Sequence, residues 1–306
     1  MSKNILITGA TGLVGQKLVP ALLAKGHQVT VLSRKKVAIQ GVNVFLWDVY
    51  KQTIDLAAFK GIDTVIHLAG EGIADKKWTA ARKKQIVDSR VLSGNLLYKA
   101  IQETGTQVHT FISASAVGLY GNRADELLTE TSKPGTDFLA DCCLAWENTA
   151  DKGIAMAIRV VKIRIGLILT KAGGVLPQLE KPIKLFVGAP LGTGKQWMPW
   201  IHLNDIVGIF CKAVDDETFT GAYNACAPNP VTNTMFTKTL AKAISRPVWP
   251  VHVPSFMLKL ILGEMSILPL MSNRTSAQKL IAAGYVFSYP TLSEALTELY
   301  DHQTTD

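Results

Sequence analysis

The sequence predicts an α/β protein with a doubly wound parallel sheet and a smaller α/β lobe at its C-terminal end. Two features of the chain lead to this fold class. In the first half, short apolar strands alternate with helical segments, and a glycine-rich turn joins the first strand to the first helix. Beyond residue 170, glycine and proline become dense and the apolar periodicity weakens. Strands separated by helices favour a parallel sheet, because each helical crossover returns the chain to the same edge.

The individual elements follow in order from their residues. Residues 4–8 form a short apolar run that ends in glycine, and residues 13–24 have leucines at helical spacing, with a kink expected at Pro20. Further strands are predicted over residues 27–33, 42–47, 63–68, 107–113 and 155–163, and further helices over residues 78–104, 138–151, 204–214, 234–244 and 254–262. We therefore divide the chain into a sheet domain, residues 1–170, and a C-terminal lobe, residues 171–306, with later strands of the sheet interleaved.

Composition and charge narrow the classes of function. A chain of 306 residues with 48% hydrophobic and 18% charged residues is neither disordered nor fibrous. The net charge of +8 favours anionic partners, which include phosphate-bearing small molecules. The basic residues are dispersed and lack the interleaved aromatic residues of single-strand binding platforms, so we expect no nucleic-acid partner.

The apolar runs and the cysteines predict the compartment. The N-terminal apolar run, residues 5–7, is too short for a signal peptide. The most apolar later stretch, residues 256–271, contains Lys259 and Glu264 and falls short of a bilayer span. We interpret it as a buried or partner-facing helix and expect no membrane partner. None of the four cysteines forms a CxxC pair, which favours a reduced, cytoplasmic compartment and no metal site.

The sharpest local signal is the segment ITGATGLVG, residues 7–15. It places Gly9, Gly12 and Gly15 between a predicted strand and a predicted helix. Gly9 allows a tight turn, Gly12 lets a pyrophosphate approach the backbone, and Gly15 lets the helix pack closely on the strand. The helix N-terminus then presents N–H groups to the phosphates. The segment therefore predicts a Rossmann-type dinucleotide site, against the alternative of a tight turn that binds no ligand.

The end of the second strand predicts which dinucleotide binds. An acidic residue about 20 positions after the glycines binds the ribose 2′-hydroxyl of NAD. Here that place holds Ser33, Arg34 and two lysines. A guanidinium pairs with a 2′-phosphate, whereas a carboxylate repels it, so we predict NADP(H) as the cofactor. The alternative is a basic surface loop with no ligand.

These residues carry a resemblance to a known family. TGATGLVG at 8–15, DTVIHLAG at 63–70 and FISASAVGLYG at 111–121 resemble the extended short-chain dehydrogenase/reductase superfamily. The segments AGEGIADKKWTAARKKQIVDSR at 69–90 and APLGTGKQWMPWIHLNDI at 189–206 are similar to its atypical branch, the "epimerase family protein" group. Together with the segment at 282–296 the resemblance covers nearly the whole chain. It implies an NADP-binding enzyme of epimerase or oxidoreductase type, and relatives of this kind often form homodimers.

The resemblance also implies roles for individual residues. Further cofactor contacts are expected at the pyrophosphate, at the adenosine side and from the helix after the fourth strand: Thr11, Leu13 and Val14; Leu68, Ala69 and Gly70; and Arg90. Leu68 as a core residue and Arg90 as a solvated helix residue are the alternatives. Arg164, near the end of the last predicted strand of the sheet domain, is a further candidate to bind a cofactor phosphate or an anionic substrate. In such relatives the substrate lies between the sheet and the smaller lobe.

The sequence departs from the superfamily at the catalytic pair. The superfamily uses Tyr-x-x-x-Lys on the helix after the fifth strand, with the tyrosine as general acid or base. Here the tyrosine position falls on Phe138 or Leu139, and the lysine position on Cys142 or Cys143. No side chain at these positions replaces the pair, and buried cysteines of this kind act as small hydrophobes.

Two other residues remain as catalytic candidates. Ser115 matches the serine that orients the substrate oxygen in the superfamily. Tyr120 follows Ser115 closely in the sequence and is a candidate proton donor; the alternative is a tyrosine that packs in the core. We therefore predict an NADP(H)-binding oxidoreductase or epimerase-like protein that acts on an unknown small molecule. The alternative is a non-catalytic NADP(H)-binding redox sensor or regulatory protein.

Overall fold

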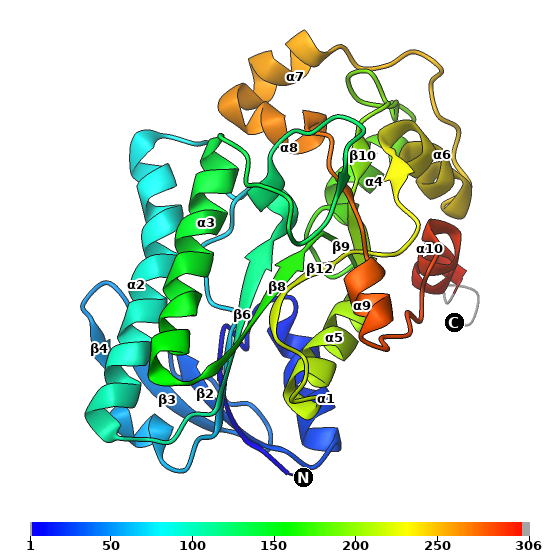
Figure 1. The fold of residues 1–306 in the computed structure, drawn as a ribbon. Coiled ribbons are helices and arrows are strands. Elements are labelled where there is room, and N and C mark those ends of the chain that lie inside the picture. Colours follow the sequence, from blue (N-terminus) through cyan, green and yellow to red (C-terminus); the bar gives the residue numbers. More distant parts are fainter. Residues whose placement is uncertain (1, 302–306) are drawn as a thin grey trace.

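The computed structural model describes residues 2–301, and its centre is an eight-stranded sheet (Figure 1). Hydrogen-bonded neighbours follow the order β12-β8-β6-β5-β1-β2-β3-β4, and all pairs are parallel except β3 with β4. The strands are β1 (Asn4–Thr8), β2 (Gln28–Ser33), β3 (Asn43–Asp48), β4 (Thr53–Ile54), β5 (Thr64–His67), β6 (Thr110–Ala116), β8 (Arg159–Ile165) and β12 (Gly221–Ala225). The predicted doubly wound fold is confirmed.

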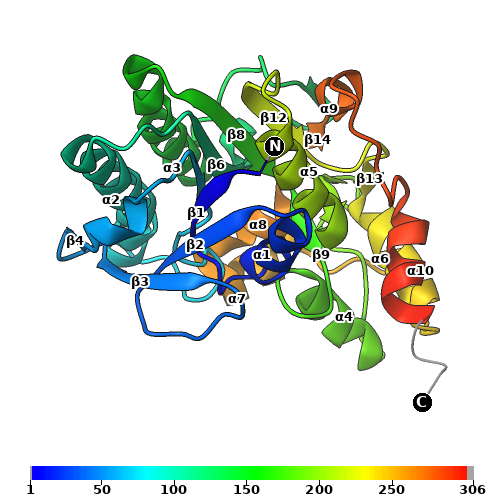
Figure 2. The ribbon, with the colours of Figure 1, turned by 90° about the horizontal axis from the view of Figure 1, so that it is seen from below.

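Helices cover both faces of this sheet (Figure 2). On one face Ile5 and Ile7 of β1 join a core cluster with α1 (Gly15–Ala24) and α5 (Leu203–Asp215). On the other face Leu6 joins a second cluster with α2 (Ala80–Thr104), and α3 (Phe138–Ala150) packs beside α2. Alternate residues of one strand thus face opposite layers. Each fully buried aliphatic side chain in these layers contributes about 1.5–3 kcal/mol.

Two predicted strands are displaced in the structure. Residues 151–156 form a 3-10 turn that ends at Ala157, whose φ of +57° is left-handed, so β8 begins only after this residue. The strand predicted over residues 107–113 lies three residues later, because Ala116 and its neighbours pair with the end of β8. Small residues such as alanine carry little strand signal of their own, which is why the sequence did not show this extension.

The later part of the chain both completes the sheet and forms the smaller lobe. The strand β12 and the helix α5 belong to the sheet layers, as the interleaving implies. The lobe contains α4 (Leu176–Lys184), α6 (Asn233–Ala243), α7 (Ser255–Leu262), α8 (Ile267–Leu270), α9 (Gln278–Ala282) and α10 (Leu292–Asp301). Its strands β10 (Trp197–Met198), β11 (Trp200–His202), β13 (Val231–Thr232) and β14 (Arg274–Thr275) are two or three residues long. Two short strands of the first 170 residues pair with them: β7 (Leu127–Leu128) with β14, and β9 (Leu167–Leu169) with β11.

The apolar stretch at residues 256–271 is not one buried helix. It contains α7, a 3-10 turn over Gly263–Ser266, and α8, and no residue of α7 is buried. The expectation of a buried helix is therefore wrong, because Gly263 ends α7 with φ +58° and none of the α7 residues is buried, whereas the alternative of a partner-facing helix stays a prediction. Within residues 2–301, no helix has the length and apolar character that crossing a membrane requires.

Candidate functional site

The turn after β1 has the backbone geometry of a phosphate-binding loop. Gly9 has φ +75°, and a Cβ at this position would lie 2.9 Å from the backbone nitrogen of Ala69. A Cβ on Gly15 would lie 2.4 Å from the Gly9 carbonyl oxygen, and Gly12 donates its N–H to that oxygen at 3.0 Å. No side chain of the described residues caps the N-terminus of α1, so its positive dipole end is available to an anion, while the N–H groups of Gln16 and Lys17 donate to the Gly12 and Val14 carbonyl oxygens.

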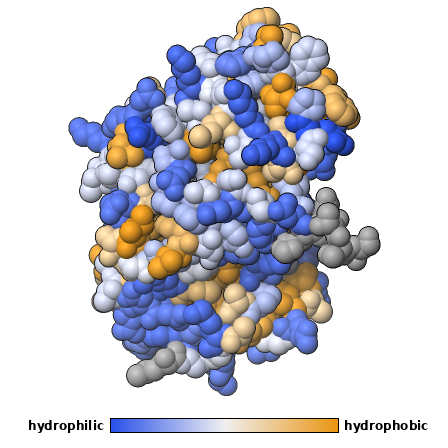
Figure 3. All heavy atoms as spheres, turned by 90° about the vertical axis from the view of Figure 1, so that its right-hand side faces the viewer, coloured by the Kyte–Doolittle hydropathy of each residue, from blue (hydrophilic) through white to orange (hydrophobic). Residues whose placement is uncertain are grey.

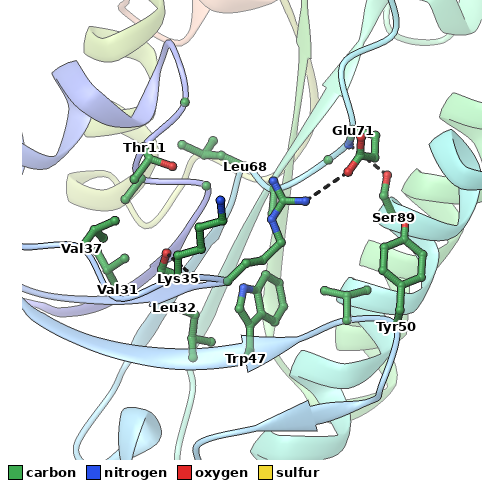
Figure 4. Close-up of a pocket in the computed structure, with 18 residues that line it drawn as sticks. Thr11, Val31, Leu32, Lys35, Val37, Trp47, Tyr50, Leu68, Glu71 and Ser89 are labelled. Atoms are coloured by element: carbon green, nitrogen blue, oxygen red, sulfur yellow. Dashed lines mark hydrogen bonds and ion pairs between the residues drawn. The ribbon is translucent and has the colours of Figure 1, made fainter. Parts of the chain in front are cut away.

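A cavity of about 430 Å³ lies beside this turn, where the carboxyl ends of β1, β2 and β5 meet (Figure 4). Open parallel sheets bind their ligands at this edge. Eight of the predicted cofactor residues line the cavity: Gly9, Thr11, Gly12, Ser33, Arg34, Leu68, Ala69 and Gly70. The structure thus brings three separate sequence segments together at one site.

The other predicted cofactor residues lie outside this lining. Leu13 follows the glycine turn and faces the smaller lobe, since Cβ atoms on Gly173 and Gly174 would contact it at 3.7 and 3.5 Å. Val14 and Gly15, the next residues, lead into α1. Arg90 of α2 borders the cavity from behind Gly70, whose Cβ would lie 3.2 Å from the guanidinium carbon.

The guanidinium of Arg34 is held by an acidic residue that the sequence reasoning missed. Its Nη1 lies 3.1 Å from Oε1 of Glu71, and the other Glu71 oxygen pairs with Arg82 at 3.0 Å. The hydrogen bond from Arg82 is the largest of the effects that lower the pKa of the Glu71 carboxyl, so this group is ionised at neutral pH. Arg34 is nonetheless 72% exposed, whereas Arg82 is buried. A bound phosphate would therefore compete with Glu71 for Arg34.

Further residues complete the wall of the cavity. Lys35 follows Arg34, while Trp47 and Tyr50 come from β3 and the turn after it (Figure 4). Ser89 lies at the opposite side and accepts the Glu71 N–H at 3.0 Å. A second basic residue and two aromatic side chains suit an adenosine phosphate. The sequence places Lys35 beside Arg34, whereas Tyr50 and Ser89 reach the cavity through contacts between distant segments, so spacing did not show them.

Ser115, a candidate to orient the substrate, is buried and hydrogen-bonded to another residue of the protein. It is 2% exposed and donates its hydroxyl hydrogen to Glu147 Oε1 at 2.7 Å. Parallel pairing places Ser115 of β6 opposite Arg164 of β8, and Arg164 forms two hydrogen bonds to the Glu147 carboxylate, at 2.8 and 2.9 Å. Burial alone would raise the pKa of Glu147, but Arg164, Ser115 and Lys162 together lower it. Arg164 therefore belongs to a buried ion pair and does not line the cavity.

Tyr120, the other catalytic candidate, is fully buried. Its hydroxyl donates to Oδ1 of Asn224 at 2.6 Å and accepts a hydrogen bond from Arg164 at 2.8 Å. Burial is the main reason that the pKa of Tyr120 rises to about 12. The packing alternative for this tyrosine fits these contacts better than the transfer of a proton at neutral pH.

The positions of the missing catalytic pair face the end of β6. A Cβ on Gly118 would lie 3.5 Å from Cβ of Leu139 and 3.8 Å from Sγ of Cys143, so these residues of α3 face the turn over Val117–Tyr120. Both residues are buried, and burial raises the pKa of the Cys143 thiol to about 12. A hydrocarbon and a neutral thiol thus stand at this place, and neither can exchange a proton at neutral pH.

Family models match two parts of the chain. Residues 5–141 match the NAD dependent epimerase/dehydratase family, and residues 253–299 match a domain of unknown function, DUF1731. The first segment contains the glycine turn and the whole lining of the cavity. The second contains α7 to α9 and most of α10.

Known proteins resemble the chain along its full length. Epimerase family protein YfhF of Bacillus subtilis is 36% identical over 308 residues, which cover 99% of each chain. The crystal structure of human epimerase family protein SDR39U1 with NADPH has a TM-score of 0.85 and 29% identity, and the match covers 97% of this chain and 99% of the human one. A nucleoside-diphosphate sugar epimerase from Corynebacterium glutamicum has a TM-score of 0.80 and 34% identity, over 99% of this chain and 59% of that one.

Proposed function

Because this chain belongs to the NAD dependent epimerase/dehydratase family, among the epimerase family proteins, we propose that it binds NADP(H) and exchanges hydride with a small molecule. One observation carries the choice of cofactor. Arg34 and Lys35 lie at the end of β2 beside a cavity that a glycine turn closes. The human relative was solved with NADPH, which supports the same choice.

The residues at the cavity fit this cofactor. The pyrophosphate would lie on the turn of Gly9 and Gly12, where added Cβ atoms would clash with backbone, and against the N-terminus of α1. Ser33, Arg34 and Lys35 would hold the 2′-phosphate through charge-assisted hydrogen bonds. Leu68 and Trp47 offer apolar surface to the adenosine.

The side chains beside the end of β6 supply no proton to the reaction. When bound, the nicotinamide supplies hydride chemistry. Leu139 and Cys143 keep the site beside β6 apolar and give no proton, and Glu147 holds the Ser115 hydroxyl. A reduction of a carbonyl compound would then take its proton from water or from the substrate itself.

Replacing Arg34 by alanine is expected to weaken NADPH binding by about 10- to 100-fold, the value of losing charge-assisted hydrogen bonds to a phosphate. NADH lacks the 2′-phosphate, so its affinity should change little. Calorimetric titration of both cofactors measures this. The matched control is Arg246→Ala, at an exposed arginine of the smaller lobe that does not line the cavity. The proposal would be contradicted if Arg34→Ala lowered the affinities for NADPH and NADH equally, or if the wild type bound neither cofactor.

Replacing Glu71 by glutamine is expected to strengthen NADPH binding about three- to tenfold. The change removes a negative charge from the cavity and frees Arg34 from its ion pair, while Arg82 keeps its hydrogen bond to the Gly72 carbonyl oxygen. The same titration measures the effect, with Glu126→Gln as the control because Glu126 pairs with an arginine outside the cavity. Weaker NADPH binding would mean that Glu71 positions Arg34 for the phosphate.

A second candidate function is a non-catalytic NADP(H)-binding sensor or regulatory protein. The leucine and the neutral thiol at the positions of the catalytic pair favour it. The two functions differ in a simple assay. A change in nicotinamide absorbance that depends on an added carbonyl compound or sugar nucleotide supports the enzyme. No turnover, with clearly different affinities for NADPH and NADP⁺, supports the sensor.

A further inference from the structure

Two stretches of the smaller lobe carry basic residues but no acidic ones. Residues 181–204 and 218–263 contain no aspartate and no glutamate. They contain seven basic residues: Lys181, Lys184, Lys195, Lys238, Lys242, Arg246 and Lys259. Acidic residues elsewhere in the lobe offset most of this charge, because residues 171–306 contain 11 basic and 10 acidic residues in all. The two stretches are therefore local basic segments, and neither contributes to the lining of the cavity beside Arg34.

The same lobe exposes large apolar side chains. On α7, Phe256 is 68% exposed, Leu260 is 84% exposed and Ile261 is 62% exposed. The helix lies at the end of the molecule farthest from the N-terminus (Figure 1), and Figure 3 shows orange side chains at this end as well as lower on the same face. Monomeric proteins rarely leave such a group of apolar side chains uncovered unless it binds something.

A second apolar group lies beside the segment that leads into α7. Trp249 donates its backbone N–H to Gly188 at 2.9 Å and its indole N–H to the carbonyl oxygen of Phe186 at 2.7 Å, so the two segments run together. Phe186, Trp249 and Val251 are all more than half exposed. The guanidinium of Arg246 lies over the Phe186 ring. Residues 185–187, residues 246–251 and α7 are called the basic apolar face below.

The carboxylates that border this face are already paired. Glu180 binds Lys184, and Glu264 at the end of α7 binds Lys83 of α2. Among the described residues, no carboxylate pairs with Lys181, Lys195, Arg246 or Lys259. Cations thus surround the exposed apolar side chains without local compensation.

We propose that the basic apolar face attaches the protein to the surface of an anionic lipid bilayer. Apolar side chains that stand out from a short helix, with lysine and arginine around them, are suited to insertion at the headgroup boundary. Each basic residue near an anionic leaflet adds to the attraction. A second copy of the chain would bring like charges together across the same face, which opposes self-association. Surface attachment needs no spanning helix, and it is an alternative to the sequence-based expectation of no membrane partner.

Cosedimentation with vesicles tests this proposal on the full chain. Vesicles of phosphatidylcholine alone are compared with vesicles that contain about one-third phosphatidylglycerol. We expect binding to the anionic vesicles only, weakened by added salt because salt screens the attraction. Leu260→Glu should reduce this binding about tenfold or more, and Lys259→Glu about fivefold or more. The matched control is Val286→Glu, at a residue that is 85% exposed but lies outside the face.

Several outcomes would overturn the proposal. Binding to neither vesicle would do so, as would equal binding to both. Anionic binding that Leu260→Glu leaves unchanged would show a general attraction of a basic protein instead. A concentration-dependent dimer that Leu260→Glu dissociates, without vesicle binding, would assign the face to a second copy of the chain. Thermal unfolding of each variant, expected to match the wild type because Lys259, Leu260 and Val286 are exposed, separates loss of binding from loss of fold.

Discussion

Replacing Arg164 by methionine is expected to lower the free energy of unfolding by about 3 kcal/mol, because the buried Glu147 carboxylate then keeps only Lys162, which lies 3.8 Å away and also pairs with Asp151 at 2.8 Å. Arg164 supplies two hydrogen bonds to Glu147, one to the Tyr120 hydroxyl and one to the Glu130 carbonyl oxygen. Both side chains of the ion pair are less than one-tenth exposed. Urea unfolding followed by circular dichroism measures the change.

A double variant distinguishes the cost of leaving one charge unpaired from the net contribution of the ion pair to the free energy of unfolding. Replacing Glu147 and Arg164 together by apolar residues of similar size should cost much less than Arg164→Met alone, since no charge is then left unpaired. Equal costs for the single and double variants would mean that the packing of Arg164 matters more than its charge. A single variant as stable as the wild type would contradict the ion pair itself.

Lowering the pH from 6.5 to 4 is expected to remove about 3 kcal/mol of stability through His67. This side chain lies at the end of β5 and is hydrogen-bonded to Thr8 at 2.8 Å and to Ser93 at 3.0 Å. Burial lowers the pKa of His67 from 6.5 to about 4. In this range the unfolded chain binds a proton that the folded chain does not, so stability is full above pH 6.5 and falls as the pH decreases.

His67→Asn provides the reference for this measurement. The variant has no titrating group at position 67, so its free energy of unfolding should fall less steeply between pH 6.5 and 4. His202 is also buried with a lowered pKa, and it contributes to both proteins alike. The difference between the two slopes therefore isolates His67. Parallel slopes would mean that His67 is protonated in the folded protein.

The sequence predicted the sheet layers and the dinucleotide cavity well, for a local reason. The glycine turn and the basic end of β2 are short segments whose function depends on neighbours in the chain, and parallel strands bring their ends to one edge. Gly9 and Arg34 could therefore be assigned before any contact was known. Cofactor preference stays a prediction until both cofactors are titrated.

The rest of the site depends on contacts between distant residues. Glu71 lies 37 residues from Arg34, and Glu147 lies 32 residues from Ser115. No periodicity or spacing links such pairs, because strand pairing and helix packing decide them. For the same reason the sequence showed an apolar stretch at residues 256–271 but not that α7 would lie uncovered. The sequence shows that the Tyr-Lys pair is absent, but it does not show that Ser115 is hydrogen-bonded to Glu147.

The contact between Ser115 and Glu147 also bears on how the chemistry of this chain could be redesigned. Two substitutions, Leu139→Tyr and Cys143→Lys, would restore the residue types of an active short-chain dehydrogenase on α3. They would not restore its serine, whose hydroxyl would still be held by Glu147, which in turn neutralises Arg164. Ser115, Glu147 and Arg164 are each hydrogen-bonded to the next, so freeing the serine hydroxyl requires coupled changes at all three positions.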